Sequence, residues 1–247
     1  MIKSYNYKDF KIEILYEDSY IAILNKPSGL LTHKKNGLDN SPNLQESLKD
    51  HFTIDDNEYL KEGIVHRLDK DTSGLMVVAR NEPAMQSLSE QISNRSIKRI
   101  YQAFTVGRIE RSGKIEAPIG RHPKNRQKQA IIESGREAIS HFKVIENFGS
   151  YSHLEVSLET GRTHQIRVHM NYLGNSIVGD DTYKKKFKKF KNIDQDLEKL
   201  LTNLNRQFLH AKTLGFFHPS KKKEMTFSSN LPNELEIILK KLRNTNK

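Results

Sequence analysis

Apolar residues recur along the chain at two spacings, and each spacing predicts a kind of regular structure. Near the N-terminus, Ile12, Ile14 and Tyr16 alternate with polar residues, and a more apolar run follows at 20–24. Alternation of period two is typical of a half-buried strand, and a short apolar run bounded by turn residues is typical of a buried strand. The pattern therefore predicts two strands, the second ending at the Lys-Pro-Ser-Gly turn of residues 26–29.

The rest of the chain continues in the same two patterns. Strands are predicted at 75–79, 96–106, 139–145, 153–158 and 225–227, with a further core segment over 208–218. Helices are predicted at 43–49, 82–94, 163–173, 194–203 and 233–242, the third with Thr163 near its cap and Gly174 at its end. The first dozen residues and the last few are expected to be loose.

The order of these elements predicts the fold class. Strands outnumber helices and do not alternate regularly with them, which argues against a doubly wound parallel sheet. We expect an α+β fold built on a mixed, largely antiparallel sheet flanked by helices and loops. No linker or repeat divides the chain, so residues 1–247 are expected to form a single domain with its core at about 12–240.

Charge and composition narrow the class of partner. Of 247 residues, 35% are hydrophobic and 29% charged, and the formal net charge is +11. Such a surplus favours a polyanionic partner, nucleic acid first and an anionic membrane second, over a merely soluble basic protein. The absence of cysteine excludes disulfides, thiolate metal sites and thiol nucleophiles. No apolar run has transmembrane length and no leader is evident, so a cytoplasmic location is expected.

One stretch carries more polar chemistry than its setting explains. At residues 63–75, two apolar residues lead into His66, Arg67, Asp69 and further polar residues before a buried strand begins. Polar groups packed near a core must satisfy one another or serve a ligand. Asp69 is therefore a candidate catalytic carboxylate, and the alternative for it is a turn aspartate that caps the residues following it.

This stretch resembles the signature of the RluA-type pseudouridine synthases, and other segments agree in order and spacing. Several long motifs in the right order are more specific than one short pattern. The match covers roughly residues 12–240. The matching segments are 26–33, 66–75, 98–103, 161–170 with 179–180, and 209–219.

The resemblance implies a reaction and a substrate. Uridine in RNA is isomerised to pseudouridine without a cofactor or metal: the N1–C1′ bond breaks, the base rotates and a C5–C1′ bond forms. The target base must be flipped out of its stack at a cost of a few kcal/mol. Ribosomal RNA is favoured over transfer RNA, because residues 69–120 most resemble the members that act on the large ribosomal subunit. We expect a monomer.

The resemblance also implies roles for three residues. Asp69 is the central carboxylate, which could attack ribose C1′ or uracil C6 or remove the C2′ proton; the sequence leaves these three open. Arg167 is expected to hold Asp69 ionised, because a guanidinium lowers the pKa of a neighbouring carboxyl group; its alternative is a helix-surface arginine. Tyr101 is expected to stack on the uracil and assist transfer of the C5 proton; its alternative is a core tyrosine.

Four further motif residues are expected to bind RNA. Arg67 resembles the side chain that fills the space left by the flipped base, with a phosphate contact or an ion pair to Asp71 as alternatives. Arg162 is expected to contact the loop or a phosphate. His66 and His164 are expected to be hydrogen-bonding residues, because their spacing and the lack of a completing carboxylate argue against a metal site.

Two features depart from the family pattern. The basic stretch Lys184–Lys191, with interleaved phenylalanines, could bind RNA or be a solvated insertion, and Lys184 replaces a usual glycine. Only about a dozen residues precede the first predicted strand, too few for the S4-type RNA-binding domain of many members. Two competing functions remain open: an RNA-binding or ribosome-assembly factor without catalysis, and a nucleoside or glycoside hydrolase that would release free base.

Overall fold

The computed structural model describes residues 3–34, 40–52, 63–183 and 195–245, and they form two compact units. The first unit comprises residues 1–99 and 211–229, and the second comprises 100–210 and 230–247. The described helices are α1 Leu44–His51, α2 Glu82–Ser93, α3 Gln165–Tyr172, α4 Gln195–Thr202 and α5 Asn233–Thr245. The described strands are β1 Lys3–Tyr7, β2 Phe10–Glu17, β3 Ile21–Lys26, β4 Ser73–Ala79, β5 Lys98–Val106, β6 Gly113–Glu116, β7 Ile119–Arg121, β8 Gln129–Ile131, β9 Ile139–Phe148, β10 Tyr151–Leu158, β11 Leu209–Phe217 and β12 Glu224–Ser228.

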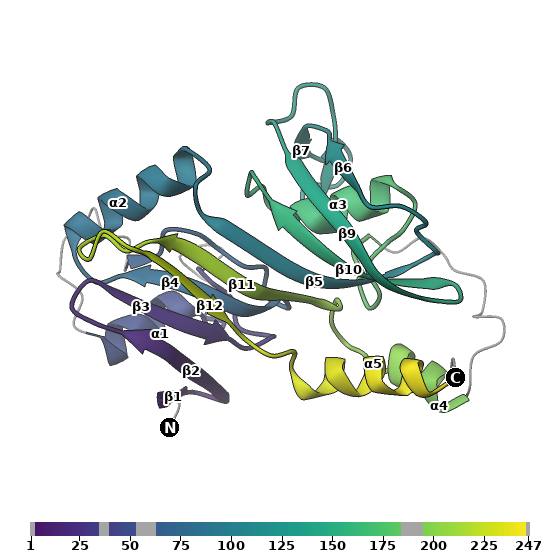
Figure 1. The fold of residues 1–247 in the computed structure, drawn as a ribbon, viewed down its shortest axis with the longest axis horizontal. Coiled ribbons are helices and arrows are strands. Elements are labelled where there is room, and N and C mark those ends of the chain that lie inside the picture. The colour runs from purple at the N-terminus through teal and green to yellow at the C-terminus, as the bar shows by residue number, and fades with distance from the viewer. Residues whose placement is uncertain (1–2, 35–39, 53–62, 184–194, 246–247) are drawn as a thin grey trace. The chain divides into compact units, whose positions relative to one another are not determined.

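The first unit is a sheet covered by a helix. Its strands lie in the order β1-β2-β3-β4-β11, and β12 pairs with β11 (Figure 1). Its core is apolar and joins three strands to α2. The buried members are Ile21, Ile23, Leu75, Val77, Ala79, Ala84, Leu88, Ile97, Leu214 and Phe216. The central strand β4 is buried at every position, as the continuous apolar run after Gly74 predicts.

Strand β1 shows that the expectation of a loose N-terminal dozen was wrong. It pairs with β2 in antiparallel register, from Lys3 opposite Ile14 to Tyr7 opposite Phe10. Tyr7 is buried, and its hydroxyl donates to Glu46 Oε2 at 2.9 Å. The polar sequence hid this strand because most of its side chains are exposed. Besides its backbone pairing, the strand is held by Tyr7 and by Tyr5, whose ring stacks on His51 and whose hydroxyl lies 3.1 Å from Ser47 Oγ.

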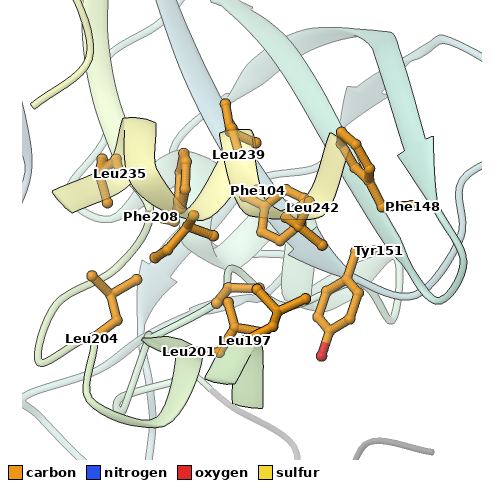
Figure 2. Close-up of a cluster of buried hydrophobic side chains, with 12 residues drawn as sticks. Phe104, Phe148, Tyr151, Leu197, Leu201, Leu204, Phe208, Leu235, Leu239 and Leu242 are labelled. Atoms are coloured by element: carbon orange, nitrogen blue, oxygen red, sulfur yellow. The ribbon is translucent and has the colours of Figure 1, made fainter. Parts of the chain in front are cut away.

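The second unit combines a sheet with a helix pair. Strands β5, β10, β9 and β6 lie in that order and pair antiparallel, and β7 and β8 form a separate hairpin. Helices α4 and α5 pack over the aromatic residues Phe104, Phe208 and Tyr151 (Figure 2). Phe104 stacks on Tyr151 with ring centroids 5.3 Å apart. Together the two units confirm the α+β class, and the expected single domain stays a prediction.

All five predicted helices are present in the described residues, and α3 begins near Thr163 as predicted. The cap is His164, next to Thr163, and it adopts the left-handed conformation (φ 57°, ψ 20°) without a side-chain cap bond. The predicted end is right, since Gly174 follows the helix at φ +86°. The basic stretch Lys184–Lys191 lies outside the described residues. No helix in the described ranges is long and apolar enough to cross a membrane.

Candidate active site

Lys26, at the end of β3, anchors the segment that carries Asp69. Its side chain is 0% exposed, and its Nζ donates to three backbone carbonyl oxygens, those of Pro27 (2.8 Å), Leu30 (2.7 Å) and Lys70 (2.9 Å). A buried ammonium must have its N–H donors matched, because an unpaired charge away from water is very costly. The backbone next to Asp69 is therefore tied to the turn that follows β3.

Two hydroxyl groups hold the residues on either side of Asp69. Thr32 Oγ1 donates to the Leu68 carbonyl at 2.8 Å, and Ser28 Oγ donates to the Asp71 carbonyl at 3.0 Å. Each bond joins the 26–32 segment to the Asp69 loop across more than thirty residues of sequence. Asp69 is thus displayed on a loop whose backbone is fixed before and after it, as preorganised catalysis requires.

His66 and Arg67 precede Asp69 and differ in exposure. The Nε2 of His66 accepts a hydrogen bond from the Val77 backbone N–H at 3.1 Å. Burial, with the positive charge of Arg99 as the second cause, lowers the pKa of His66 to about 3, so its imidazole is neutral. Arg67 is exposed. Within the described range 63–183, it forms no ion pair with Asp71.

Tyr101 lies in β5, which is buried on both faces as predicted. The residue is 7% exposed and lies opposite Val156 of β10. Successive side chains of a strand point to opposite faces, so Tyr101 faces away from the side on which Phe104 packs. The ring therefore does not belong to the apolar cluster of α4 and α5.

Arg167 forms a buried, two-pronged ion pair with Asp180. Arg167 Nε lies 2.7 Å from Asp180 Oδ2 and Nη2 lies 2.9 Å from Oδ1, with side-chain exposures of 7% and 1%. Asp180 Oδ1 also accepts from the backbone N–H groups of Thr182 and Tyr183. The guanidinium carbon lies 5.1 Å from the centre of the Tyr183 ring. Charge, hydrogen bonds and ring together fix the orientation of Arg167.

His164 and Arg162 surround the start of α3. His164 Nδ1 and the Tyr183 hydroxyl are 2.8 Å apart, and that hydroxyl accepts from the Gln129 backbone N–H. Since the oxygen accepts from Gln129, its own proton can be donated to His164. Arg162 Nε donates to the Glu137 carbonyl at 2.8 Å. Both motif residues thus have structural partners within the second unit.

Comparison with known proteins identifies the family. Residues 20–172 match the family described as RNA pseudouridylate synthase. This chain belongs to that family. The predicted resemblance and the predicted enzyme class are therefore confirmed.

Relatives of this pseudouridylate synthase family member span almost the whole chain. It is 43% identical over 236 residues to "Ribosomal large subunit pseudouridine synthase D" of Pseudomonas aeruginosa, covering 96% of this chain and 73% of that protein. The identity is 41% over 239 residues to the protein of that name from Xanthomonas campestris, covering 96% and 71%. The solved structure "Human RNA Pseudouridylate Synthase Domain Containing 4" is similar with a TM-score of 0.71 and 23% sequence identity, and the match covers 93% of this chain and 92% of that one. Because the identity is low, this similarity supports the fold alone.

The pseudouridylate synthase motifs divide between the two units. Asp69, His66 and Arg67 lie on one loop of the first unit, and Tyr101, Arg162, His164 and Arg167 belong to the second. Lys26 and Asp180 lie within the matching motifs, but the sequence alone predicted no role for either residue. A lysine that ends a buried strand just before a Pro-Ser-Gly turn was the available signal for Lys26, because its ammonium then needs nearby carbonyl groups.

Proposed function

We propose that this chain isomerises uridine to pseudouridine in ribosomal RNA of the large subunit. Two curated relatives at 43% and 41% identity carry that substrate in their names. The observation that carries the proposal is the fixed loop around Asp69, in which buried Lys26 and two hydroxyls hold the neighbouring carbonyls. A binding protein has no need of a carboxylate on a loop whose backbone is held in this way.

The proposed chemistry assigns three roles. Asp69 acts as the nucleophile or base at ribose C1′, uracil C6 or the C2′ proton while the N1–C1′ bond breaks. Tyr101 stacks on the uracil and helps to remove the C5 proton after the C5–C1′ bond has formed. Arg167 supplies the cation that keeps Asp69 ionised, because a guanidinium lowers the pKa of a neighbouring carboxyl group.

Arg67, Arg162, His66 and His164 are proposed to support RNA binding. Exposure of Arg67 fits a side chain that enters the RNA stack or meets a phosphate. The acceptor nitrogen of His66 serves Val77, which supports an indirect role in shaping the loop. The net charge of +11 supplies the general attraction to a polyanion. The cytoplasmic location and the monomeric state stay predictions.

The variant Asp69→Asn tests the proposal, because it removes the charge and keeps the size of the side chain. Pseudouridine is mapped in total RNA from cells that carry the wild-type gene, the variant or neither. We expect one or more large-subunit uridines to lose modification with the variant while RNA affinity is retained. Normal turnover by Asp69→Asn overturns the catalytic assignment.

The same maps distinguish the alternatives. Sites lost from transfer RNA alone would place the substrate there, and an unchanged map without the gene would favour a non-catalytic RNA-binding or assembly factor. Free uracil released from RNA would indicate a hydrolase, because an isomerase retains the base.

A further inference from the structure

The second unit contains a pocket that the proposed reaction does not use. Its volume is about 450 Å³, and it lies between the segment of the β7–β8 hairpin and helix α3. Its polar and aromatic lining includes His122, Lys128, Gln129, Asn171, Tyr172 and Tyr183. Neither Tyr101 nor Arg167 lines it, so it is not the place proposed for the target uracil. A volume of this size is typical of small-ligand sites.

The aromatic and apolar lining suits a flat ring. Tyr172, on the last turn of α3, is 61% exposed, which is unusual for a large ring on an otherwise buried helix. Tyr183 is buried, and its hydroxyl is held by Gln129 and His164. Val168, one turn before Tyr172 on α3, adds an apolar side chain to the lining. One fixed ring and one ring open to solvent are what single-stranded RNA-binding sites use to stack a base.

The polar lining suits the rest of a nucleotide. The side-chain amides of Gln129 and Asn171 can each donate and accept, as the edge of a base requires. Lys128 is half-buried, and its Nζ donates to the Thr182 carbonyl at 2.6 Å, which keeps the ammonium at the pocket. Among the described residues that line the pocket, none is acidic. A phosphate at this place would therefore meet a cation and no repelling carboxylate.

The segment beside the pocket extends this positive charge. Arg121 is exposed at the end of β7, and Lys124 and Arg126 are exposed on the loop that joins β7 to β8. The loop is shaped by His122, whose Nδ1 accepts from the backbone N–H groups of Lys124 and Asn125, both at 3.1 Å. A cationic rim around an aromatic pocket attracts an RNA backbone and presents a place for one of its bases.

We propose that this pocket binds one nucleotide of the substrate RNA other than the target uridine. Its base stacks on Tyr172 and its phosphate meets Lys128. The proposal rests on the proposed function, since it concerns the same RNA. Tyr183 connects the pocket to the motif residues. Its hydroxyl contacts His164, and the guanidinium of Arg167 lies over its ring. A second extruded nucleotide would thus be held against the wall that also orients Arg167.

The test measures the affinity of the whole chain for an unmodified transcript of large-subunit ribosomal RNA. In an Asp69→Asn background, which blocks turnover, Tyr172→Ala is expected to weaken binding by about 5- to 150-fold, the range of one lost base–aromatic stack. Tyr172→Phe, which keeps the ring, should stay within about twofold. Leu173→Ala is the matched control, because Leu173 neighbours Tyr172, is 41% exposed and lies outside the pocket lining.

Ultraviolet cross-linking of the same complex locates the contact, and the expected cross-link joins an RNA base to Tyr172. Affinity that is equal for Tyr172→Ala and Leu173→Ala, or a cross-link confined to other segments, overturns the pocket proposal. Failure of the proposed function has a different signature: wild-type protein forms no pseudouridine in the transcript. Loss of affinity in Tyr172→Ala would then still assign an RNA subsite to the pocket.

Discussion

Arg167 and Asp180 are joined by two hydrogen bonds in a buried ion pair, thirteen residues apart in sequence. Asp180 follows Gly179, whose φ of +74° and close approach to the Arg206 carbonyl leave no room for a side chain. Asp180 is therefore positioned by a glycine turn, and Arg167 is positioned by helix α3. Arg167, expected from the sequence to hold Asp69, is itself held by a second carboxylate.

Breaking this pair should strongly destabilise the second unit. Asp180→Asn removes the counter-charge and leaves Arg167 buried, at an expected cost of about 3–5 kcal/mol in the free energy of unfolding. Urea denaturation followed by circular dichroism measures the change. Glu116→Gln is the control, because its pair with Lys114 is exposed and should contribute no more than about 1 kcal/mol. Equal effects of the two substitutions would contradict the assigned importance of burial.

Replacing Lys26 should loosen the Asp69 loop. Lys26→Met keeps the length of the side chain but leaves the carbonyls of Pro27, Leu30 and Lys70 without this donor. Charged hydrogen bonds contribute about 1.5–3 kcal/mol each, so a loss of at least 3 kcal/mol in unfolding free energy is expected, together with lost pseudouridine formation. Lys70→Met, at an exposed position, should change stability by less than about 0.5 kcal/mol. Full stability of Lys26→Met would refute the anchoring role.

Sequence patterns predicted the fold class and most elements because apolar periodicity follows burial directly. They failed for β1, because most of its side chains are exposed and the contacts of Tyr5 and Tyr7 that hold it are made with distant residues. They predicted the cap of α3 near Thr163, one residue from the observed cap, but not its geometry: His164 turns the chain by adopting positive φ without a side-chain cap bond.

Candidate site residues were predicted less completely than the elements. Motif resemblance predicted Asp69, Tyr101 and Arg167 as site residues, but it did not predict the residues that hold the Asp69 loop and Arg167. Lys26 acts on backbone carbonyls, which carry no side-chain signal, and Asp180 pairs with Arg167 only after a glycine turn has placed it. Such partners depend on tertiary structure, which spacing along one sequence does not encode.

Gly74 should not tolerate a side chain. It has φ +122°, and a Cβ atom there would lie 2.3 Å from the Ala211 carbonyl oxygen, a backbone atom that cannot move away cheaply. Gly74→Ala is expected to cost at least about 3 kcal/mol in thermal or urea unfolding, from backbone strain and overpacking. At Gly149, with φ +55° and no atom within 4 Å of a built Cβ, the same change should cost only about 1–2 kcal/mol. A reversed order would contradict the close approach of β4 and Ala211.

The protonation of His66 should make stability depend on pH. Its folded pKa of about 3 lies below the value of about 6.5 in an unfolded chain, so the unfolded state takes up the proton first. Stability is therefore complete above pH 6.5 and falls as the pH drops toward 3, by about 2 kcal/mol at pH 4.5 after allowance for partial exposure. His66→Gln keeps an acceptor for Val77 and cannot titrate. The loss of unfolding free energy between pH 7 and 4.5 should be smaller in this variant; an identical loss would exclude His66 as the source.

The salt dependence of RNA binding should reveal how Arg67 is used. If six to ten phosphates are contacted, affinity falls about 10³- to 10⁵-fold between 50 and 200 mM salt. An arginine that contacts a phosphate adds nearly one to the slope of log affinity against log salt, whereas one that fills the space of a flipped base does not. Because the family resemblance assigns Arg67 to the space left by the flipped base, and its exposure permits that role, we expect Arg67→Gln to leave the slope nearly unchanged and to reduce the single-turnover rate of pseudouridine formation at least tenfold. A slope lowered by about one with an unchanged rate would instead assign Arg67 to a phosphate.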